Sequence, residues 1–274
     1  MEHINLNIQS GIESNTGCGG HHIKGVIQQY RESMKGADFL KFKAIFLDFY
    51  GTLVHEDDDI IPVICNRIHG NAEVECNSRE IGSYWWREFS SIFKDSYGDS
   101  FQLQRDIGIN SLSKTIETFK SDIVAEELIQ IQFEHWIKPR LYPDTIPFLQ
   151  AFESTPVYIL SNIDSDDILK AIDYHKIRVT DIITSEDVKS YKPRSEMFYE
   201  ALKRSNLKAG EVIHIGDSIL SDVGGAQNLG ISVVWLNRLN KSLPKGVSPD
   251  LICKDLNEVK TYLLNGFEEG SIVV

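Results

Sequence analysis

Asp48 is the residue of this sequence whose position most plainly suggests chemistry. It follows the apolar run AIFL at 44–47 and precedes a turn that contains Gly51 and Thr52. An apolar run that ends in an acid and a glycine turn is typical of a buried strand that delivers a carboxylate to a loop. At the carboxyl end of a strand such a carboxylate can act as a nucleophile or a metal ligand. The alternative is an aspartate that only ends a strand and caps a turn.

Three later segments place polar side chains at the ends of similar runs. They are Ser161-Asn162, Lys192-Pro193, and Gly216-Asp217-Ser218 with Asp222. If these runs are parallel strands or their loops, the side chains share one edge of a sheet and one site. Carboxylates with a backbone carbonyl suit Mg²⁺, while a lysine with hydroxyl and amide groups can bind phosphate oxygens. Singly, each could be a helix cap, a solvated lysine or a turn residue.

The elements that would position these residues alternate along the second half of the chain. Strand-like runs lie at 156–162, 181–187, 211–217 and 231–237, with helical patterns near 165–174, 198–206 and 223–230. This alternation predicts an α/β fold with a parallel sheet wrapped by helices. Residues 56–142 have helical spacing and few strand signals. We expect a helical cap domain at 56–142, inserted into a core domain of 42–55 and 143–274, after an N-terminal extension at 1–41.

Composition narrows the classes of partner. The 274 residues, 42% of them hydrophobic, can form one sizeable core and a smaller domain. The net charge of -12 argues against nonspecific binding of nucleic acid. Four scattered cysteines favour reduced thiols, and neither a membrane-length run nor a secretory signal is evident. We expect a cytoplasmic protein that binds a small molecule rather than nucleic acid or a membrane; no signal indicates an oligomeric state.

The order of the four motifs carries a resemblance. D-x-Y-G-T-L, then SN, then KP, then GDSxxxD is similar to the order in the haloacid dehalogenase-like (HAD) hydrolase superfamily, over about residues 42–240. The resemblance implies a Rossmann-like, doubly wound core with a helical cap inserted after the first motif. It also implies hydrolysis through an aspartyl-enzyme intermediate and, in most members, Mg²⁺.

The matching positions assign roles to individual residues. Asp48 would be the nucleophile and Lys192 the charge-stabilising lysine. The phosphate would be bound by Ser161, with Thr52 and Asn162. Mg²⁺ would be bound by Asp48, Asp217 and the backbone carbonyl of Tyr50, while Asp222 would bind it directly or orient its waters. In phosphatases of the superfamily a second aspartate normally stands where this chain has Tyr50. An unperturbed tyrosine, with a pKa of about 10, is a poor base near neutral pH.

The missing acid leaves three functions open. A phosphatase could take its acid from the cap, from the loop Asp164-Ser165-Asp166-Asp167, or from the substrate. The D-x-Y-G-T form, Trp86-Arg87 and the run Trp235-Leu236-Asn237-Arg238 also resemble 2-haloacid dehalogenases, which need no metal. A binding or regulatory module with the same fold is the third reading. We favour a Mg²⁺-dependent phosphatase because the acidic pair at 217 and 222 suits a metal, with Arg87 as a substrate-binding residue of the cap.

Overall fold

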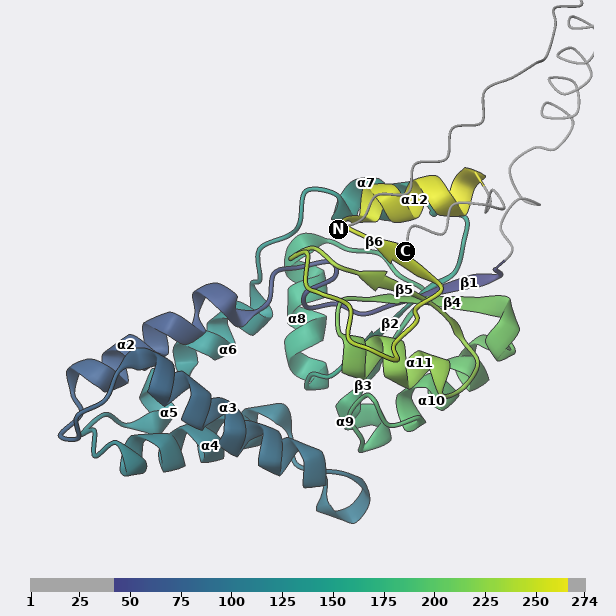
Figure 1. The fold of residues 1–274 in the computed structure, drawn as a ribbon. Coiled ribbons are helices and arrows are strands. Elements are labelled where there is room, and N and C mark those ends of the chain that lie inside the picture. The colour runs from purple at the N-terminus through teal and green to yellow at the C-terminus, as the bar shows by residue number, and fades with distance from the viewer. Residues whose placement is uncertain (1–41, 266–274) are drawn as a thin grey trace, which may run out of the picture. The chain divides into compact units, whose positions relative to one another are not determined.

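The structure, a computed structural model, describes residues 42–265, so the expected extension at 1–41 lies outside the described residues. Six strands form one parallel sheet in the order β3-β2-β1-β4-β5-β6 (Figure 1). Their bounds are β1 Ala44–Leu47, β2 Val157–Ser161, β3 Asp181–Thr184, β4 Val212–Gly216, β5 Ser232–Leu236 and β6 Leu251–Cys253. The predicted parallel α/β fold is confirmed.

The strand order makes the sheet doubly wound. From β1 in the middle, the chain moves outward to β2 and β3, then returns to β4 on the other side of β1 and continues to β5 and β6. The switch in direction lies between β1 and β4, where open α/β sheets bind their ligands. Leu47 is paired with Ile215, so these two strands end at the same level.

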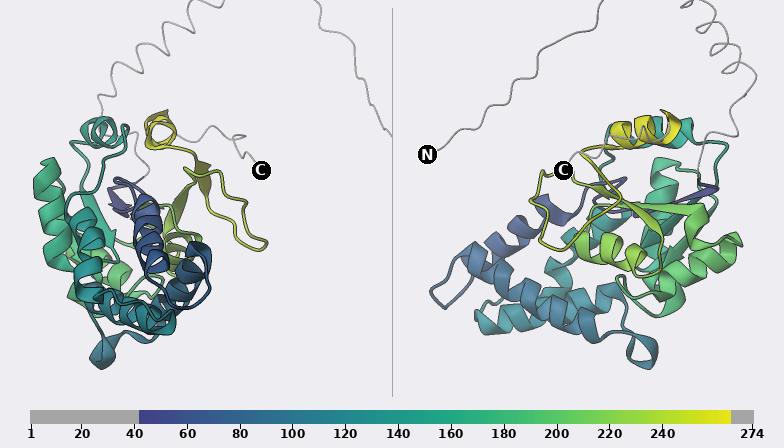
Figure 2. Two further views of the ribbon diagram at one scale, coloured as in Figure 1. Left: turned by 90° about the vertical axis from the view of Figure 1, so that its left-hand side faces the viewer. Right: turned by 45° about the vertical axis from the view of Figure 1, so that its right-hand side comes forward.

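Each face of the sheet has its own core. On β1, Ile45 and Leu47 belong to one hydrophobic cluster and Ala44 and Phe46 to the other, as the twofold alternation of a strand requires. The first cluster contains side chains of α7 (Thr145–Ala151), α8 (Ser165–His175) and α12 (Leu256–Asn265); the second contains side chains of α10 (Glu196–Ser205) and α11 (Gly225–Gln227). Figures 1 and 2 show α7 beside α12 on one face, with α10 and α11 on the other. A short α9 (Ser185–Val188) follows β3.

The expected helical insert follows β1. It consists of α2 Ile61–Gly70, α3 Ser78–Asp95, α4 Gln104–Thr118, α5 Ala125–Leu128 and α6 Gln130–Ile137. Asn77 begins α3 with a capping box: its Oδ1 accepts from the backbone N–H groups of Arg79 and Glu80, while the Glu80 carboxylate accepts from the Asn77 N–H. This exchange satisfies amides that the first turn leaves unpaired. None of the described helices is long and apolar enough to cross a membrane.

Three local features differ from expectation. The edge strand β6 was not predicted, since three residues are too short to show an alternating pattern. The helical pattern expected over 56–142 is interrupted at Ile129, between α5 and α6, where the Gln132 N–H donates to the Ile129 carbonyl oxygen in a tighter turn. The helix expected near 223–230 is preceded by a π-helical turn, Ile219–Gly224. Such turns often occur at functional sites.

Gly225 tests how tightly α11 packs near the sheet edge. A Cβ at Gly225 would lie 2.6 Å from Cε2 of Phe198 and 3.3 Å from Cα of Pro193. We therefore expect Gly225→Ala to lower the free energy of unfolding by about 1–3 kcal/mol through overpacking. Gly224→Ala is the matched control, because its nearest atom, the Ile219 carbonyl oxygen, would be 3.6 Å away. Urea denaturation measures both; equal stability of the two variants would contradict the packing argument.

Candidate active site

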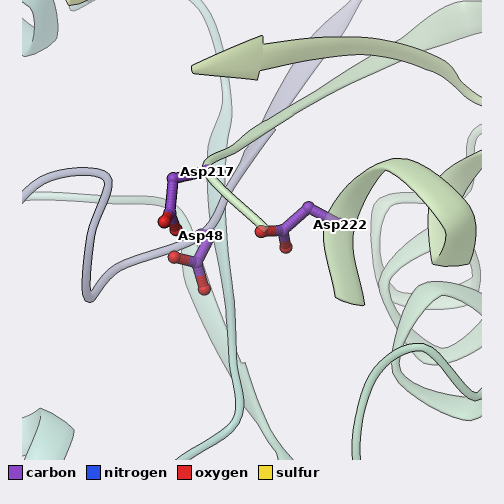
Figure 3. A group of neighbouring side chains, drawn as sticks. All are labelled: Asp48, Asp217 and Asp222. Carbon is purple, nitrogen blue, oxygen red and sulfur yellow. The ribbon is translucent and has the colours of Figure 1, made fainter. Parts of the chain in front are cut away.

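Three carboxylates converge at the carboxyl edge of the sheet (Figure 3). Asp48 follows β1, Asp217 follows β4, and Asp222 comes from the π-helical turn after it. One carboxylate oxygen from each residue lies within 4.8 Å of the other two. Because β1 and β4 are neighbours, the loops that follow them bring these acids together as the motif order predicted.

Lys192 is the cation of this cluster. Its Nζ donates to Oδ1 of Asp48 at 2.9 Å, to Oδ1 of Asp222 at 2.6 Å and to the carbonyl oxygen of Leu160 at 2.7 Å. These three bonds use all the protons of the ammonium group, and the residue is only 1% exposed. Lys192 therefore holds two of the acids at fixed positions from a buried site.

The two residues expected to bind phosphate from the end of β2 differ in their contacts. Asn162 binds the main chain of Lys192: its Nδ2 donates to the carbonyl oxygen at 3.0 Å, and its Oδ1 accepts from the N–H at 2.7 Å. Ser161 is buried, and its hydroxyl makes no hydrogen bond to any described residue. The amide of Asn162 is thus occupied in positioning the lysine, while the Ser161 hydroxyl keeps its bonding capacity.

Thr52 lies in the turn after Asp48 and is fully buried. Within residues 42–265 its Oγ1 has no hydrogen-bond partner, and its carbonyl oxygen accepts from Nη2 of Arg238 at 2.8 Å. Arg238 also forms a bidentate ion pair with Asp144, at 3.0 Å for each bond. This arginine, part of the run that resembled the dehalogenases, therefore has its guanidinium bound to the core.

The charges of the cluster act unequally on its members. Burial would lower the pKa of Lys192, but the negative charges of Asp222 and Asp48 outweigh it and raise that pKa. Burial would likewise raise the pKa of Asp222, but the charge of Lys192 prevails and lowers it. Asp222 also accepts from Nε2 of His214 and from the Ser218 N–H, both at 3.0 Å. Burial lowers the pKa of His214, so this imidazole is neutral and its Nε2 carries the proton.

The other two acids have less compensation. Burial is the largest effect on Asp48 and raises its pKa to about 6, although Lys192 opposes it. Burial, followed by the negative charges of Glu56 and Asp48, raises the pKa of Asp217 well above its ordinary value. In the described part of the chain the Asp217 carboxylate has no hydrogen bond or ion pair. When all three carboxylates are ionised, the single ammonium group leaves two negative charges, which a divalent cation would balance.

Gly51 makes room for Asp217. Its φ of +84° lies in the left-handed region that favours glycine. A Cβ at Gly51 would be 2.5 Å from Oδ1 of Asp217, well inside van der Waals contact. The glycine of the first motif is therefore required both by the turn and by the carboxylate next to it.

Tyr50 directs its hydroxyl away from the carboxylates and into the helical insert. The hydroxyl donates to the carbonyl oxygen of Trp136 in α6 at 2.6 Å. Burial, then the negative charge of Asp167, raises the pKa of the phenol well above its ordinary value. Tyr50 consequently keeps its proton, and it attaches the insert to the loop that carries Asp48. No backbone N–H in 42–265 bonds its carbonyl oxygen, which remains available as a ligand.

The acids of the loop at 164–167 also bind the insert. Asp164 accepts from the backbone N–H groups of Gln104 at 2.7 Å and Arg105 at 3.0 Å, at the start of α4. Asp167 forms a bidentate pair with the Arg105 guanidinium, at 2.8 and 2.6 Å. Both carboxylates are therefore committed to structure at the junction of α8 and α4.

Arg87 is not brought to the carboxylates. Its side chain is 67% exposed on α3, where it lies 3.8 Å from Glu88 and over the ring of Tyr84. Trp85 is buried in the insert and donates to the Ser111 hydroxyl, whereas Trp86 is exposed. The aromatic run at 84–86 is thus divided between the interior and the surface of the insert, as helical periodicity requires.

A cavity opens beside Asp217. It is lined by Gly51, Glu56, Asp58, Tyr142, Asp217, Leu236, Asn237, Arg238, Leu239 and Lys241. Glu56 and Lys241 were not singled out from the sequence, because one acid in a run of acids and one lysine in a polar loop carry no distinguishing pattern. His214 was also missed, although a histidine inside the apolar strand VIHIG was a usable signal.

Comparison with known proteins places these motifs in a family. A family model of haloacid dehalogenase-like hydrolases matches residues 42–230. Pyrimidine 5'-nucleotidase YjjG of Escherichia coli is 31% identical over 83 residues, which is 30% of this chain and 37% of that protein. Haloacid dehalogenase-like hydrolase domain-containing protein 3 of Danio rerio is 34% identical over 83 residues, which is 30% of this chain and 34% of the length of that protein. The chain thus spans about a third of the length of these curated relatives.

Two likenesses extend over most of the fold. (S)-2-haloacid dehalogenase 1 of a Pseudomonas species is 23% identical over 76% of this chain and 89% of that protein. The solved structure of the HAD-hydrolase YfnB from Bacillus subtilis, bound to magnesium, has a TM-score of 0.63 and 18% identity, covering 82% of this chain and 99% of that one. With the four ordered motifs, the doubly wound sheet and the family match over 42–230, the chain belongs to the haloacid dehalogenase-like hydrolase family.

Proposed function

We propose that this protein is a Mg²⁺-dependent phosphatase that hydrolyses a small phosphorylated metabolite through an aspartyl-phosphate on Asp48. The observation that carries the proposal is the uncompensated charge of the three carboxylates around Lys192. Metal-free halide displacement uses one carboxylate as the nucleophile and one base to activate water, so it gives no use for a third acid. Hard carboxylate oxygens with a net charge of minus two suit Mg²⁺.

The residues present fit such an ion. Neither carboxylate oxygen of Asp217 makes a hydrogen bond to a residue within 42–265, and Asp48 shares one oxygen with Lys192. The Tyr50 carbonyl oxygen is available as a third ligand. Asp222 accepts bonds from Lys192, His214 and Ser218, which favours the role of orienting waters over direct binding. Mg²⁺ held there would neutralise charge that develops on the phosphoryl oxygens.

The chain's own groups account for the two chemical steps. In the first, an oxygen of Asp48 attacks phosphorus in line and the bond to the leaving oxygen breaks. In the second, water attacks the phosphoryl group and Asp48 is released as a carboxylate. Lys192 offsets negative charge through both steps, and the Ser161 hydroxyl is a donor for a phosphoryl oxygen. Asn162 acts by positioning Lys192.

The helical insert at 56–142 would act as a cap that shapes the substrate site. Its attachments to the core through Tyr50 and Arg105 lie close to the proposed nucleophile and to α8. A cap in this place limits the access of water and contacts the part of the substrate that is not phosphate. Arg87 would contribute only if α3 approached the carboxylates, because it lies exposed in the insert.

A 2-haloacid dehalogenase is the second candidate, favoured by the likeness to the Pseudomonas enzyme over 76% of this chain and by Tyr50 in the first motif. Against it, both Arg87 and Arg238 are directed to other contacts, the second to Asp144. A binding module is the third candidate. Binding alone does not explain why a lysine is buried between two acids.

Asp48→Asn tests the nucleophile. An amide cannot form the acyl phosphate, so phosphate release should fall by at least about a thousandfold. Asp173→Asn is the matched control: Asp173 is exposed on α8, its side chain pairs with Lys176 alone among the described residues, and the variant should keep full activity. Colorimetric phosphate release measures both, with thermal unfolding to verify the fold. Wild-type turnover by Asp48→Asn would refute the aspartyl-phosphate.

Removal of metal tests the cation. EDTA should abolish phosphate release, and added Mg²⁺ should restore it. The apparent affinity for Mg²⁺ should decline as the pH falls through about 6, because Asp48, with its pKa raised to about 6, then takes up a proton that competes with the metal. Titration of activity with Mg²⁺ at several pH values measures this. An affinity that stays constant from pH 8 to pH 5 would contradict it.

A paired assay separates the three candidate functions. Sugar phosphates, nucleotides and acyl phosphates are screened for phosphate release, and 2-chloropropionate is screened for halide release with EDTA present. We expect phosphate from at least one class and no halide. Halide release without metal would establish the dehalogenase, and the absence of any product would support the binding module.

A further inference from the structure

In the proposed phosphatase reaction, no residue has yet been assigned to donate a proton to the leaving oxygen. A phosphate ester expels an alkoxide, and general acid catalysis of that step contributes about 10²–10⁴ in rate. Tyr50, at the position of the usual acid, has a raised pKa, and its hydroxyl donates a hydrogen bond to the carbonyl oxygen of Trp136. Unless the substrate supplies its own proton, another acid near the carboxylates has to donate it.

Most nearby acids are already committed. Asp164 and Asp167 bind Arg105. Asp57 accepts from Gln132 and Trp136 in α6. The remaining committed acids are Asp144, which binds Arg238, and Asp222, which binds Lys192. Carboxylates whose oxygens already accept hydrogen bonds from the protein are held in place by those bonds and are poorly placed to reach a substrate.

Glu56 is different in both contacts and place. Among the described residues it has no hydrogen bond or ion pair, and it does not cap the short turn Asp57–Asp59 that follows it. Its side chain is exposed, and it lines the cavity together with Gly51 and Asp217. No hydrogen bond joins it to Asp48 or Asp217. Glu56 is thus an uncommitted carboxyl group in a cavity that is also lined by Asp217, one of the three acids.

We propose that Glu56 is the general acid and base of the reaction, in place of the side chain missing at Tyr50. The assignment rests on the proposed phosphatase function, and its basis is the place of Glu56 in the cavity beside Asp217 and the lack of described bonds to its carboxyl group. Asp58 lines the same cavity and is also exposed and unbonded in the described region, which makes it the matched control.

The proton balance of the two steps is complete. As Asp48 attacks phosphorus, the bond to the leaving oxygen breaks with its electron pair on oxygen, and that oxygen takes the proton of the Glu56 carboxyl group. Glu56 is then a carboxylate. It takes a proton from the attacking water as the new phosphorus–oxygen bond forms and the bond to Asp48 breaks. Inorganic phosphate leaves, Asp48 is again a carboxylate, and Glu56 is again protonated.

The charges around Glu56 agree with this role. Loss of water and then the negative charges of Asp48 and Asp58 raise its pKa to about 7, with Asp57 adding to the rise and Lys241 opposing it. Because Glu56 is exposed, we attribute the rise of its pKa to the nearby negative charges more than to loss of water. A carboxyl group that titrates near neutral pH can both give and take a proton during turnover.

Glu56→Gln, with Asp58→Asn as control, tests the assignment by the leaving group. An alkyl phosphate that the wild-type protein hydrolyses needs a proton on its leaving oxygen, and Glu56→Gln should lower its turnover by about 10²–10⁴. p-Nitrophenyl phosphate expels a stable phenolate without a proton. On this substrate Glu56→Gln should release a burst of one p-nitrophenolate per active site and then turn over slowly, because its phosphorylated Asp48 lacks the base. Asp58→Asn should keep the burst-free, wild-type pattern on both substrates, with its pH profile moved to lower pH because one charge that raises the pKa of Glu56 is removed.

Three results would overturn the role of Glu56 while leaving the phosphatase in place. They are wild-type turnover of the alkyl phosphate by Glu56→Gln, an equal loss on both substrates without a burst, and recovery of the variant at higher Mg²⁺, which would make Glu56 a group that supports the metal. A wild-type protein that releases phosphate from no substrate would instead refute the proposed function itself. Thermal unfolding of both variants verifies that each is folded.

Discussion

The buried ammonium of Lys192 is the interaction on which the rest of the site depends. Lys192 is only 1% exposed, and burial of a charge lowers the stability of the fold unless its protons are all hydrogen-bonded. Here two carboxylates and the Leu160 carbonyl oxygen accept those protons. Those bonds join the loops after β1 and β4 to the end of β2. Asn162 secures the main chain of the lysine from β2. One side chain thereby fixes three loops that are far apart in the sequence.

The sequence predicted the site correctly where residues with reactive side chains stand at the ends of predicted strands. Asp48, Lys192, Asp217 and Asp222 could be placed together in advance because parallel strands deliver their carboxyl ends to one edge. The parallel sheet followed from the alternation of strand and helix patterns. By contrast, β6 could not be foreseen, since three residues at a sheet edge obtain their structure from pairing with β5 rather than from a local pattern.

Other features depended on contacts that no local pattern contains. The amide of Asn162 and the carboxylates of Asp164 and Asp167 each looked suited to a substrate or a proton, yet each binds a distant segment. Arg87 has the chemistry to bind an anion, but its position on an exposed part of α3 separates it from the acids. Residue type states what a group can bind, and only tertiary structure decides whether that capacity is already used.

The hydrogen bond from Tyr50 to Trp136 has a consequence for how this chain can vary. In a protein where one side chain both serves the reaction and faces the insert, a substitution there changes two properties together. Here position 50 ties the insert to the core by a neutral phenol, and any proton transfer must be done elsewhere. Attachment and chemistry can then diverge separately, so that the helices α2 to α6 can change for a new substrate without alteration of the reacting groups.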